Sequence, residues 1–477
     1  MGSTANNKHG GGVYVDIGGK FTLNKGNIIG NSATQDGGGV YVGGEFTMKD
    51  GSIAGNSTQW GGGVHVNSSG TAFTMNDGLI VGNTASADGG GVNIGNDQAE
   101  CTFELKGGTI KGNTATTGNG GGVCVAWGDS FTMFNEATIS GNTAQKGGGV
   151  YSDNGLFEMT GGTISGNTAT VLGGGGVYVM CVGTFTMKNG RIIENNTAGD
   201  AGGVYVGGGT FTMEGGEITG NTAEYSGGGV YVTGGTFNVS KAPVIRDNKM
   251  GNADNNVYLN GADKLKLTGP LSSPAEIHIT NPVSGQFGTV DTSKYATPKQ
   301  SDADHFVADS TSPVVAAKLE SYILKWVEAH TVTIDNTIQH GEITAFPAPA
   351  YNGATVTLTA TPDAGYQLKA GSLTYTPNDG SPTTISGNTF TMPAANVTVT
   401  AEFEIPVKKS STTQGTSIWL TAEPTTAPAT PAPTPTPTPE VPQVKPVETK
   451  QAETPVPFMG VITGLGCAAV VFGLRRK

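Results

Sequence analysis

Positive charge is scarce in this chain of 477 residues, and its four cysteines follow no pattern. Lys and Arg total 26 against 38 Asp and Glu, and the formal net charge is −12. Binding to a nucleic-acid backbone needs clustered cations that displace counterions, so we expect no nucleic-acid partner. The cysteines lack the close pairs of a zinc site and the regular spacing of a disulfide framework. We therefore expect no metal and no cofactor.

A signal peptide is also missing, whereas the carboxyl end carries a long apolar run. Met1–His9 has neither a charged start nor an apolar core. Phe458–Leu474 is an uninterrupted run of 17 apolar and small residues, and Arg475-Arg476-Lys477 follows it. At ~1.5 Å per residue a helix over this run reaches ~25 Å, which predicts a transmembrane segment at 458–474 and a cytoplasmic basic tail at 475–477. The bulk of the chain is then extracellular. Because export needs a signal and the repeats begin at Gly10, we expect the true amino terminus to be missing.

A glycine-rich hexapeptide recurs through the first half of the chain. Gly37-Gly38-Gly39-Val40-Tyr41-Val42 is repeated at intervals of 24 to 31 residues, most often 27. Each unit also contains a block such as Phe46-Thr47-Met48 and a third block such as Thr163–Ala169. The alternation of period two is typical of strands, and three short strands cannot bury their apolar faces alone. We therefore predict that residues 1–260 stack about ten rungs, ~4.8 Å apart, as a right-handed parallel β-helix.

Two columns of side chains stand out in this arrangement. Asparagines that follow the third strand, mostly in Gly-Asn pairs, are expected to stack as a structural amide ladder within the turns. Six of them are Asn56, Asn83, Asn113, Asn142, Asn167 and Asn221. The middle residue of the hexapeptide points outward, and four tyrosines there are candidates for contact with glycans or another partner: Tyr151, Tyr178, Tyr205 and Tyr231. The alternative is that these tyrosines simply stack on one another.

Acidic residues are the natural test for catalysis, because lyases need clustered acids with a base and hydrolases need paired carboxylates. The repeat alignment finds none in the outward column of the second strand, formed by Thr22, Thr47, Thr74, Thr132, Thr186 and Thr212. Arg191 and Arg246 stand alone at third-strand positions in that alignment. We expect no catalytic residue and no enzymatic activity. The alternative is a glycan-active β-helix enzyme, either a polysaccharide lyase or a hydrolase.

The repeat resembles a known class of surface proteins. Ile164-Ser165-Gly166-Asn167-Thr168-Ala169, followed by Gly174-Gly175-Gly176-Val177-Tyr178, is similar to the repeats of polymorphic outer-membrane proteins. It is also similar to the wider pectin-lyase-like β-helix class of adhesin-like proteins. The resemblance covers roughly residues 10–260 and implies the fold rather than an activity.

The second half of the chain divides into further regions. Residues 261–329 are predicted to cap the solenoid, with Val314–Trp326 either a strand pair or one amphipathic helix. Residues 330–405 are predicted to form a small β domain, since Val356, Leu358 and Ala360 alternate with threonines. This segment resembles the divergent internalin-B-type repeat, which implies a spacer or interaction module. Residues 406–457 are predicted to be a Pro/Thr-rich disordered stalk in extended polyproline II form.

The order of stalk, apolar run and basic tail is similar to a carboxyl-terminal surface-sorting signal. The pentapeptide Leu-Pro-x-Thr-Gly is missing, and Thr454-Pro455-Val456-Pro457-Phe458 stands in its place. We therefore expect a membrane-anchored, adhesin-like or structural protein on the cell surface. Its partners are expected to be glycans or other surface components, besides the membrane itself.

Overall fold

The computed structural model describes residues 8–95, 100–280, 285–310, 312–378 and 380–406. The predicted stalk, transmembrane segment and basic tail lie outside these residues. Within the described ranges, no helix is long and apolar enough to cross a membrane. The helix α1 (Gln300–Ala303) spans four residues, and nearly all other regular structure is β. The predicted all-β class is confirmed.

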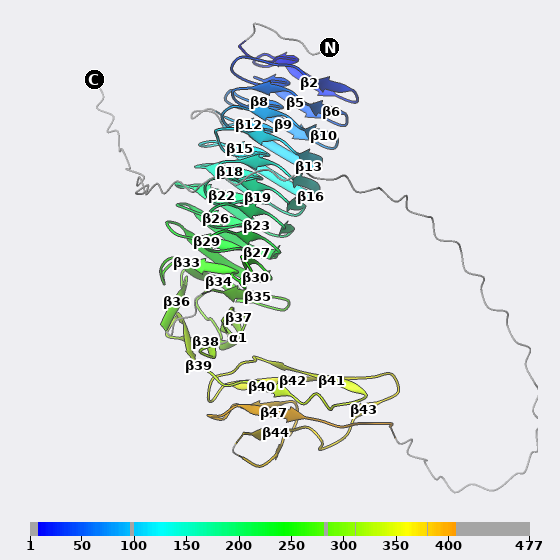
Figure 1. Cartoon of the computed structure of the whole chain (residues 1–477), viewed down its shortest axis with the longest axis vertical. Coiled ribbons are helices and arrows are strands. Elements are labelled where there is room, and N and C mark those ends of the chain that lie inside the picture. Colours follow the sequence, from blue (N-terminus) through cyan, green and yellow to red (C-terminus); the bar gives the residue numbers. More distant parts are fainter. Residues whose placement is uncertain (1–7, 96–99, 281–284, 311, 379, 407–477) are drawn as a thin grey trace, which may run out of the picture. The chain divides into compact units, whose positions relative to one another are not determined.

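The first half of the chain coils into a right-handed parallel β-solenoid of about 11 turns (Figure 1). Each strand pairs in parallel with the equivalent strand of the next turn, so Val40 lies beside Val64 and Phe46 beside Phe73. The first-strand column consists of β1 (Val13–Val15), β4 (Val40–Val42), β8 (Val64–Val66), β12 (Val92–Ile94), β15 (Val123–Val125), β18 (Val150–Asp153), β22 (Val177–Met180), β26 (Val204–Val206), β29 (Val230–Val232) and β33 (Val257–Leu259).

The second and third strands of a turn are separate in some turns and continuous in others. The second-strand column is β2 (Lys20–Leu23), β5 (Glu45–Met48), β9 (Ala72–Met75), β13 (Thr102–Lys111), β16 (Ser130–Ser140), β19 (Leu156–Met159), β23 (Thr184–Met187), β27 (Thr210–Thr219), β30 (Thr236–Arg246) and β34 (Leu265–Leu271). The separate third strands are β3 (Asn27–Ile29), β6 (Ser52–Ala54), β10 (Leu79–Val81), β20 (Thr163–Ser165), β24 (Arg191–Ile193) and β35 (Glu276–Ile279). In the remaining turns β13, β16, β27 and β30 run on through the third-strand position.

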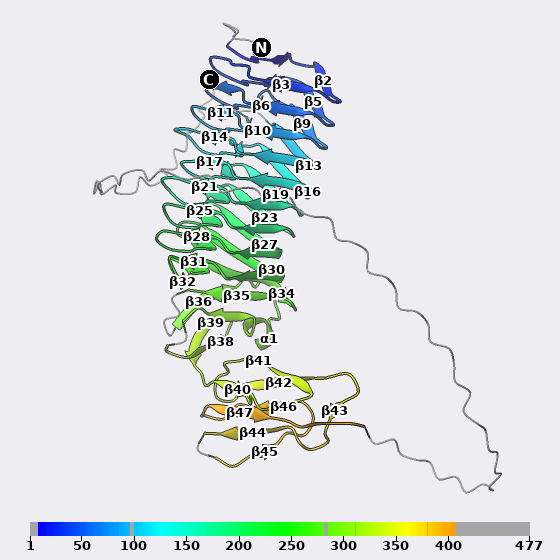
Figure 2. The same ribbon diagram turned by 45° about the vertical axis from the view of Figure 1, so that its right-hand side comes forward.

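A fourth strand, which the sequence analysis did not separate from the third, completes the turn (Figure 2). It has two residues, usually Thr-Ala, and follows the turn asparagine. Two residues are too few to show an alternating pattern in a sequence. The column is β7 (Ser57–Thr58), β11 (Thr84–Ala85), β14 (Thr114–Ala115), β17 (Thr143–Ala144), β21 (Thr168–Ala169), β25 (Asn196–Thr197), β28 (Thr222–Ala223) and β31 (Lys249–Met250), with β32 (Ala253–Asp254) antiparallel at its end.

The core is a set of side-chain columns that run the length of the solenoid. Val40, Val42, Phe46, Met48 and Ile53 of one turn are each no more than 1% exposed, and their equivalents in later turns pack directly on them. The phenylalanine rings of neighbouring turns stack nearly parallel, as between β9 and β13, where the ring centroids lie 4.6 Å apart. Each Å² of apolar surface buried in these columns contributes about 25 cal/mol to the stability of the fold. A single turn cannot bury this surface by itself, because its neighbours cover it.

The carboxyl end of the solenoid is closed by antiparallel strands. The parallel columns continue through β36 (Gly285–Val290) and β37 (Phe306–Ala308). The hairpin of β38 (Val315–Glu320) and β39 (Ile323–Glu328) then pairs antiparallel to β36. Residues 314–326 are therefore a strand pair rather than an amphipathic helix. Trp326 is 3% exposed and its ring stacks on Phe287 at 4.5 Å, so the hairpin covers apolar surface that would otherwise face solvent.

Residues 330–404 fold around a second apolar core, formed by residues such as Val356, Leu358, Phe390 and Val399. One sheet has the order β41–β42–β46 and another the order β40–β47–β44–β45. The strands are β40 (Val332–Ile334), β41 (Gly341–Phe346), β42 (Thr355–Pro362), β43 (Gln367–Leu368), β44 (Thr374–Pro377), β45 (Thr383–Thr384), β46 (Thr389–Thr391), β47 (Val397–Thr400) and β48 (Phe403–Glu404). The valine and leucine of β42 point inward and its threonines point to solvent, as their alternation indicates.

Candidate functional site

The turn asparagines form a continuous buried ladder. The backbone N–H and the Nδ2 of Asn142 both donate to Oδ1 of Asn167, at 3.0 and 2.9 Å, and Nδ2 also donates to the carbonyl of Ile110 at 3.1 Å. The six asparagines expected in this ladder are at most 1% exposed: Asn56, Asn83, Asn113, Asn142, Asn167 and Asn221. Because they are buried and bonded to one another, they stabilise the turns and offer nothing to a ligand.

The ladder is longer than the six asparagines expected from the sequence. Asn31, Asn195, Asn248 and Asn256 also belong to it. In two turns the residue before the asparagine is not glycine, yet Glu194 and Asp247 still adopt positive φ of 56° and 60°. A search for Gly-Asn misses these turns. The position of asparagine relative to the Ile column would have found them.

A carboxylate ends the ladder at the cap. Asp309 Oδ2 accepts from the backbone N–H of Asn256 at 2.8 Å, and Oδ1 accepts from its Nδ2 at 2.6 Å. Thr280 and His278 also bond to Asp309, whose side chain is 3% exposed. Burial opposes ionisation of Asp309, but its hydrogen bonds, with that from His278 foremost, hold its pKa below the usual value. Each ladder asparagine donates its backbone N–H and one Nδ2 hydrogen to the next residue toward this end, so a negative charge complements the last pair of donors.

The tyrosine column does not present ring faces to solvent. Tyr151 and Tyr178 are 7% and 4% exposed, and Tyr205 and Tyr231 are half-buried. The rings of Tyr178 and Tyr205 stack at 4.4 Å and 11°, and those of Tyr205 and Tyr231 lie at 5.4 Å and 35°. Ring faces that cover each other are not free to stack on a sugar. The interpretation of Tyr151 and Tyr178 as glycan contacts therefore needs correction, and stacking within the column accounts for them.

Glycine backbone lies close to the ring of Tyr205 on two sides. A Cβ at Gly173 would lie 2.4 Å from the ring of Tyr205, and one at Gly207 would lie 2.8 Å from the opposite side of that ring. Lys146 Nζ lies 5.7 Å from the ring centroid of Tyr178. Burial raises the pKa of the Tyr205 hydroxyl to about 12. Neighbouring loops thus close over a position that strand alternation alone marks as outward.

Acidic residues do occur in the outward threonine column, contrary to the repeat alignment. The strand register places Glu104 beside Thr74 and Thr132, and Glu158 beside Thr132 in the following turn. Glu104 forms an ion pair with Lys106 at 3.0 Å, and Glu158 forms one with Lys188 at 2.8 Å. Across the described residues, no group of three or more His, Cys, Asp or Glu side chains could hold a metal ion.

The two third-strand arginines are also paired rather than alone. Arg191 Nε donates to Glu217 Oε2 at 3.2 Å. Arg246 contacts Asp247 at 2.6 Å and Glu276 at 3.4 Å. Glu217 and Glu276 belong to the following turns, so these two pairs connect neighbouring turns on the outside of the solenoid, whereas Asp247 is the next residue in the chain after Arg246.

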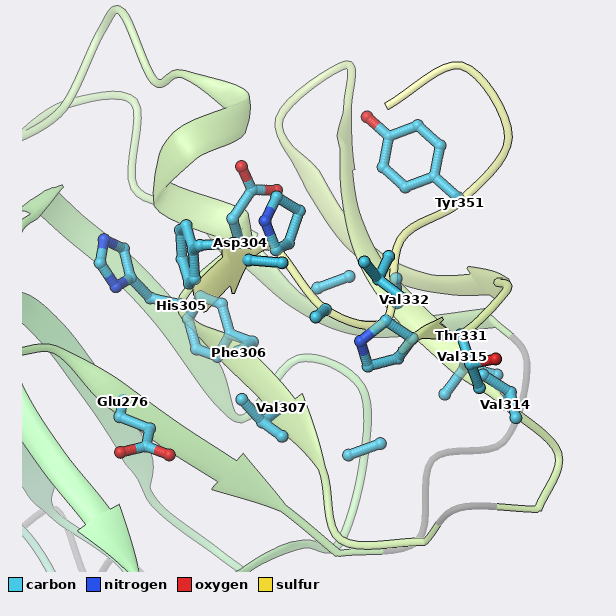
Figure 3. A pocket seen from close by; sticks show the side chains of 18 of the residues that line it. Glu276, Asp304, His305, Phe306, Val307, Val314, Val315, Thr331, Val332 and Tyr351 are labelled. Atoms are coloured by element: carbon cyan, nitrogen blue, oxygen red, sulfur yellow. The ribbon is translucent and has the colours of Figure 1, made fainter. Parts of the chain in front are cut away.

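An apolar pocket of about 690 Å³ lies beside β37 and β38 (Figure 3). Its apolar lining includes Phe306, Val315, Val332 and three prolines, and Asp304 and His305 are among its polar residues. These two are already partnered, since Asp304 accepts from Gln300 at 2.8 Å and His305 Nδ1 lies 2.7 Å from the carbonyl of Ala275. The sequence analysis did not detect this pocket because its lining comes from four separate segments.

A second hollow is open and polar, and lies where the second strand meets the third in four consecutive turns. Its volume is about 680 Å³. Glycines of three turns form much of its lining, and the polar side chains around it are Asn135, Thr163, Asn189, Arg191 and Glu217. The sequence analysis named Arg191 but did not bring it together with the two asparagines.

Comparison with known proteins concerns the second half of the chain. Residues 330–407 match the family model of the Divergent InlB B-repeat domain, in agreement with the resemblance seen in the sequence. No curated protein and no solved structure matches the chain. The chain thus combines a parallel β-solenoid with a segment similar to the divergent InlB B-repeat domain.

Proposed function

We propose that this chain is a non-catalytic, adhesin-like or structural protein that is anchored at the cell surface and projects a β-solenoid outward. The observation that carries the proposal is the combination of a long, internally saturated solenoid with an InlB B-type repeat segment in one chain. About 11 turns at ~4.8 Å give a rod of roughly 50 Å. Such a rod suits a scaffold that holds a contact surface away from its anchor.

The organisation of the side chains supports a scaffold role. The turn asparagines satisfy one another, the aromatic rings stack on one another, and the outward acids pair with lysines. The pectin-lyase-like resemblance and the sorting-type carboxyl end extend the proposal: the apolar run at 458–474 would hold the chain in the membrane, with the solenoid outside. The partners would be glycans or other components of a cell surface.

The proposal can be tested on intact cells that express the full chain behind an added export signal. A protease that cannot cross the membrane should cleave the solenoid-bearing part, and the chain should fractionate with membranes. A variant that lacks residues 458–477 should appear in the medium instead. Protection of the solenoid in intact cells, with cleavage only after lysis, would contradict a surface location.

One observation favours the enzymatic alternative enough to merit its own test. Glu104 and Glu158 share an outward column two turns apart, or ~9.6 Å along the solenoid, which is near the upper separation of carboxylates in inverting glycosidases. Polysaccharide hydrolysis that is lost in Glu104→Gln and Glu158→Gln would support the enzyme. Equal behaviour of wild type and both variants on a polysaccharide panel would count against it.

A further inference from the structure

We infer that the polar hollow between the second and third strands of four consecutive turns is a binding site for a neutral oligosaccharide. Counted from β1, these are turns 5–8, whose second strands are β16, β19, β23 and β27. This inference rests on the proposed surface role, and it moves the glycan contact from the tyrosine column to another face of the solenoid. The hollow is formed by residues of β16, β20, β24 and β27 and of the corners that precede them.

Glycine backbone forms much of the lining, because successive turns approach closely at this corner: a Cβ at Gly162 or Gly216 would lie 2.7 or 2.6 Å from a backbone oxygen of the preceding turn. Gly162, Gly190 and Gly216 have φ of +87°, +103° and +87°, a region that side chains rarely adopt. A Cβ at Gly161 would lie 1.9 Å from Oδ1 of Asn135. The asparagine side chain thus lies over a bare backbone in the next turn. The exposed carboxamides of Asn135 and Asn189 thus lie beside partly exposed glycine backbone at one surface.

The polar rim offers donors and acceptors in pairs. Asn135 and Asn189 are exposed and occupy corresponding corners of turns 5 and 7, with Thr163 of turn 6 between them. A carboxamide presents an acceptor oxygen beside a donor NH2 group, which matches the neighbouring hydroxyls of a sugar ring. Arg191 has five N–H donors, of which its bond to Glu217 uses one. The rim therefore suits a ligand covered with hydroxyl groups.

Charge pairing favours a neutral ligand over an anionic one. Arg191 is neutralised by Glu217, and the adjacent lysines Lys188 and Lys241 are neutralised by Glu158 and Glu214. An acidic glycan would have to compete with Glu217 for the arginine. A protein partner would need a buried aromatic or aliphatic anchor, and the polar residues named around the hollow supply none. Three steps between turns 5 and 8 span about 14 Å, enough for a short oligosaccharide.

The test uses the full chain in a detergent without a sugar headgroup, on an array of neutral, sialylated and sulfated oligosaccharides. Titration calorimetry with the neutral glycan retained best then compares wild type with N135A/N189A and with R191A. We expect each variant to lose about tenfold or more in affinity, the equivalent of one or two hydrogen bonds. Matched controls are N196A, at an exposed asparagine of the fourth-strand column, and R246A, at the other paired third-strand arginine. Both controls should bind as wild type does.

The outcomes separate this inference from the proposed function. Neutral glycans that bind wild type and both hollow variants equally would overturn the site but leave the surface role intact. Retention of acidic glycans alone, lost in R191A, would overturn the ligand class. If the array retains nothing while the chain is found at the cell surface, the inference fails and the proposed function stands.

Discussion

Replacing Asn142 by alanine should destabilise the middle of the solenoid by several kcal/mol. The side chain makes four hydrogen bonds: Nδ2 donates to Asn167 and Ile110, and Oδ1 accepts from the backbone N–H and the Nδ2 of Asn113. After the change, the backbone N–H of Asn113 has lost its Oδ1 acceptor inside a fully buried corner. An unsatisfied buried donor costs about 1–3 kcal/mol, and each of the three other lost bonds about 0.5–1.5 kcal/mol, so we expect a loss of about 2.5–7.5 kcal/mol.

Urea unfolding followed by circular dichroism, with hydrogen exchange of individual amides, measures this effect. Exchange should accelerate most in the turns beside Asn142, because each turn contacts only its neighbours. The control is Asn196→Ala, since this asparagine is exposed and donates one long bond of 3.4 Å to Glu194. That variant should change stability by no more than about 0.5 kcal/mol. A loss below about 1 kcal/mol for Asn142→Ala, or equal losses for the two variants, would refute the reasoning about the ladder.

Three further predictions concern buried groups. Burial lowers the pKa of His65 to about 4, so between pH 6.5 and 4 only the unfolded chain binds this proton. The free energy of unfolding should therefore fall by about 3 kcal/mol as the pH is lowered from about 6.5 to about 4. In pH-dependent melting curves, His65→Gln should remove this fall. Asp309 has a lowered pKa, so its contribution to the stability of the fold is present above about pH 4 and lost in stronger acid. Asp309→Asn should lower the melting temperature at pH 7 and weaken its dependence on pH in acid. An unchanged melting temperature would exclude a role in ending the ladder. Phe157→Ala removes a ring that is 1% exposed from the phenylalanine column and should cost about 3–5 kcal/mol in urea unfolding, whereas Leu156→Ala, whose side chain is 55% exposed, should cost far less.

The raised pKa of His278 makes the stability of the cap decrease as the pH rises, whereas the contribution of Asp309 is lost as the pH falls. Although burial disfavours the charged ring, hydrogen bonds to Asp309 and Glu276 raise its pKa. The stabilisation is therefore complete below about pH 6.5 and declines as the pH rises through the pKa of the folded chain. Chemical shifts of the ring followed against pH would measure this pKa. A value at or below 6.5 would contradict the arrangement at the end of the ladder.

The sequence by itself determined the repeating core, because a side chain that must meet its equivalent in the next turn leaves a visible period. Val40, Phe46 and Ile53 recur at matched positions, and their alternation identifies the buried face whatever the length of the loops. Most of the asparagine ladder was visible for the same reason. The alternation of threonine with apolar residues likewise predicted strand β42 of the InlB B-type segment.

Only the tertiary structure decided which outward positions remain accessible and which side chains meet across turns. Tyr178 is outward by alternation but buried, because its ring lies between those of Tyr151 and Tyr205 in the neighbouring turns. Glu104 and Glu158 escaped the aligned column because they replace threonine in single turns, and the register of paired strands was needed to place them. Asp309 ends the ladder by accepting from Asn256, which lies 53 residues earlier in the chain. The sequence period identifies contacts that recur in every turn, whereas these features depend on residues that depart from the repeat in single turns.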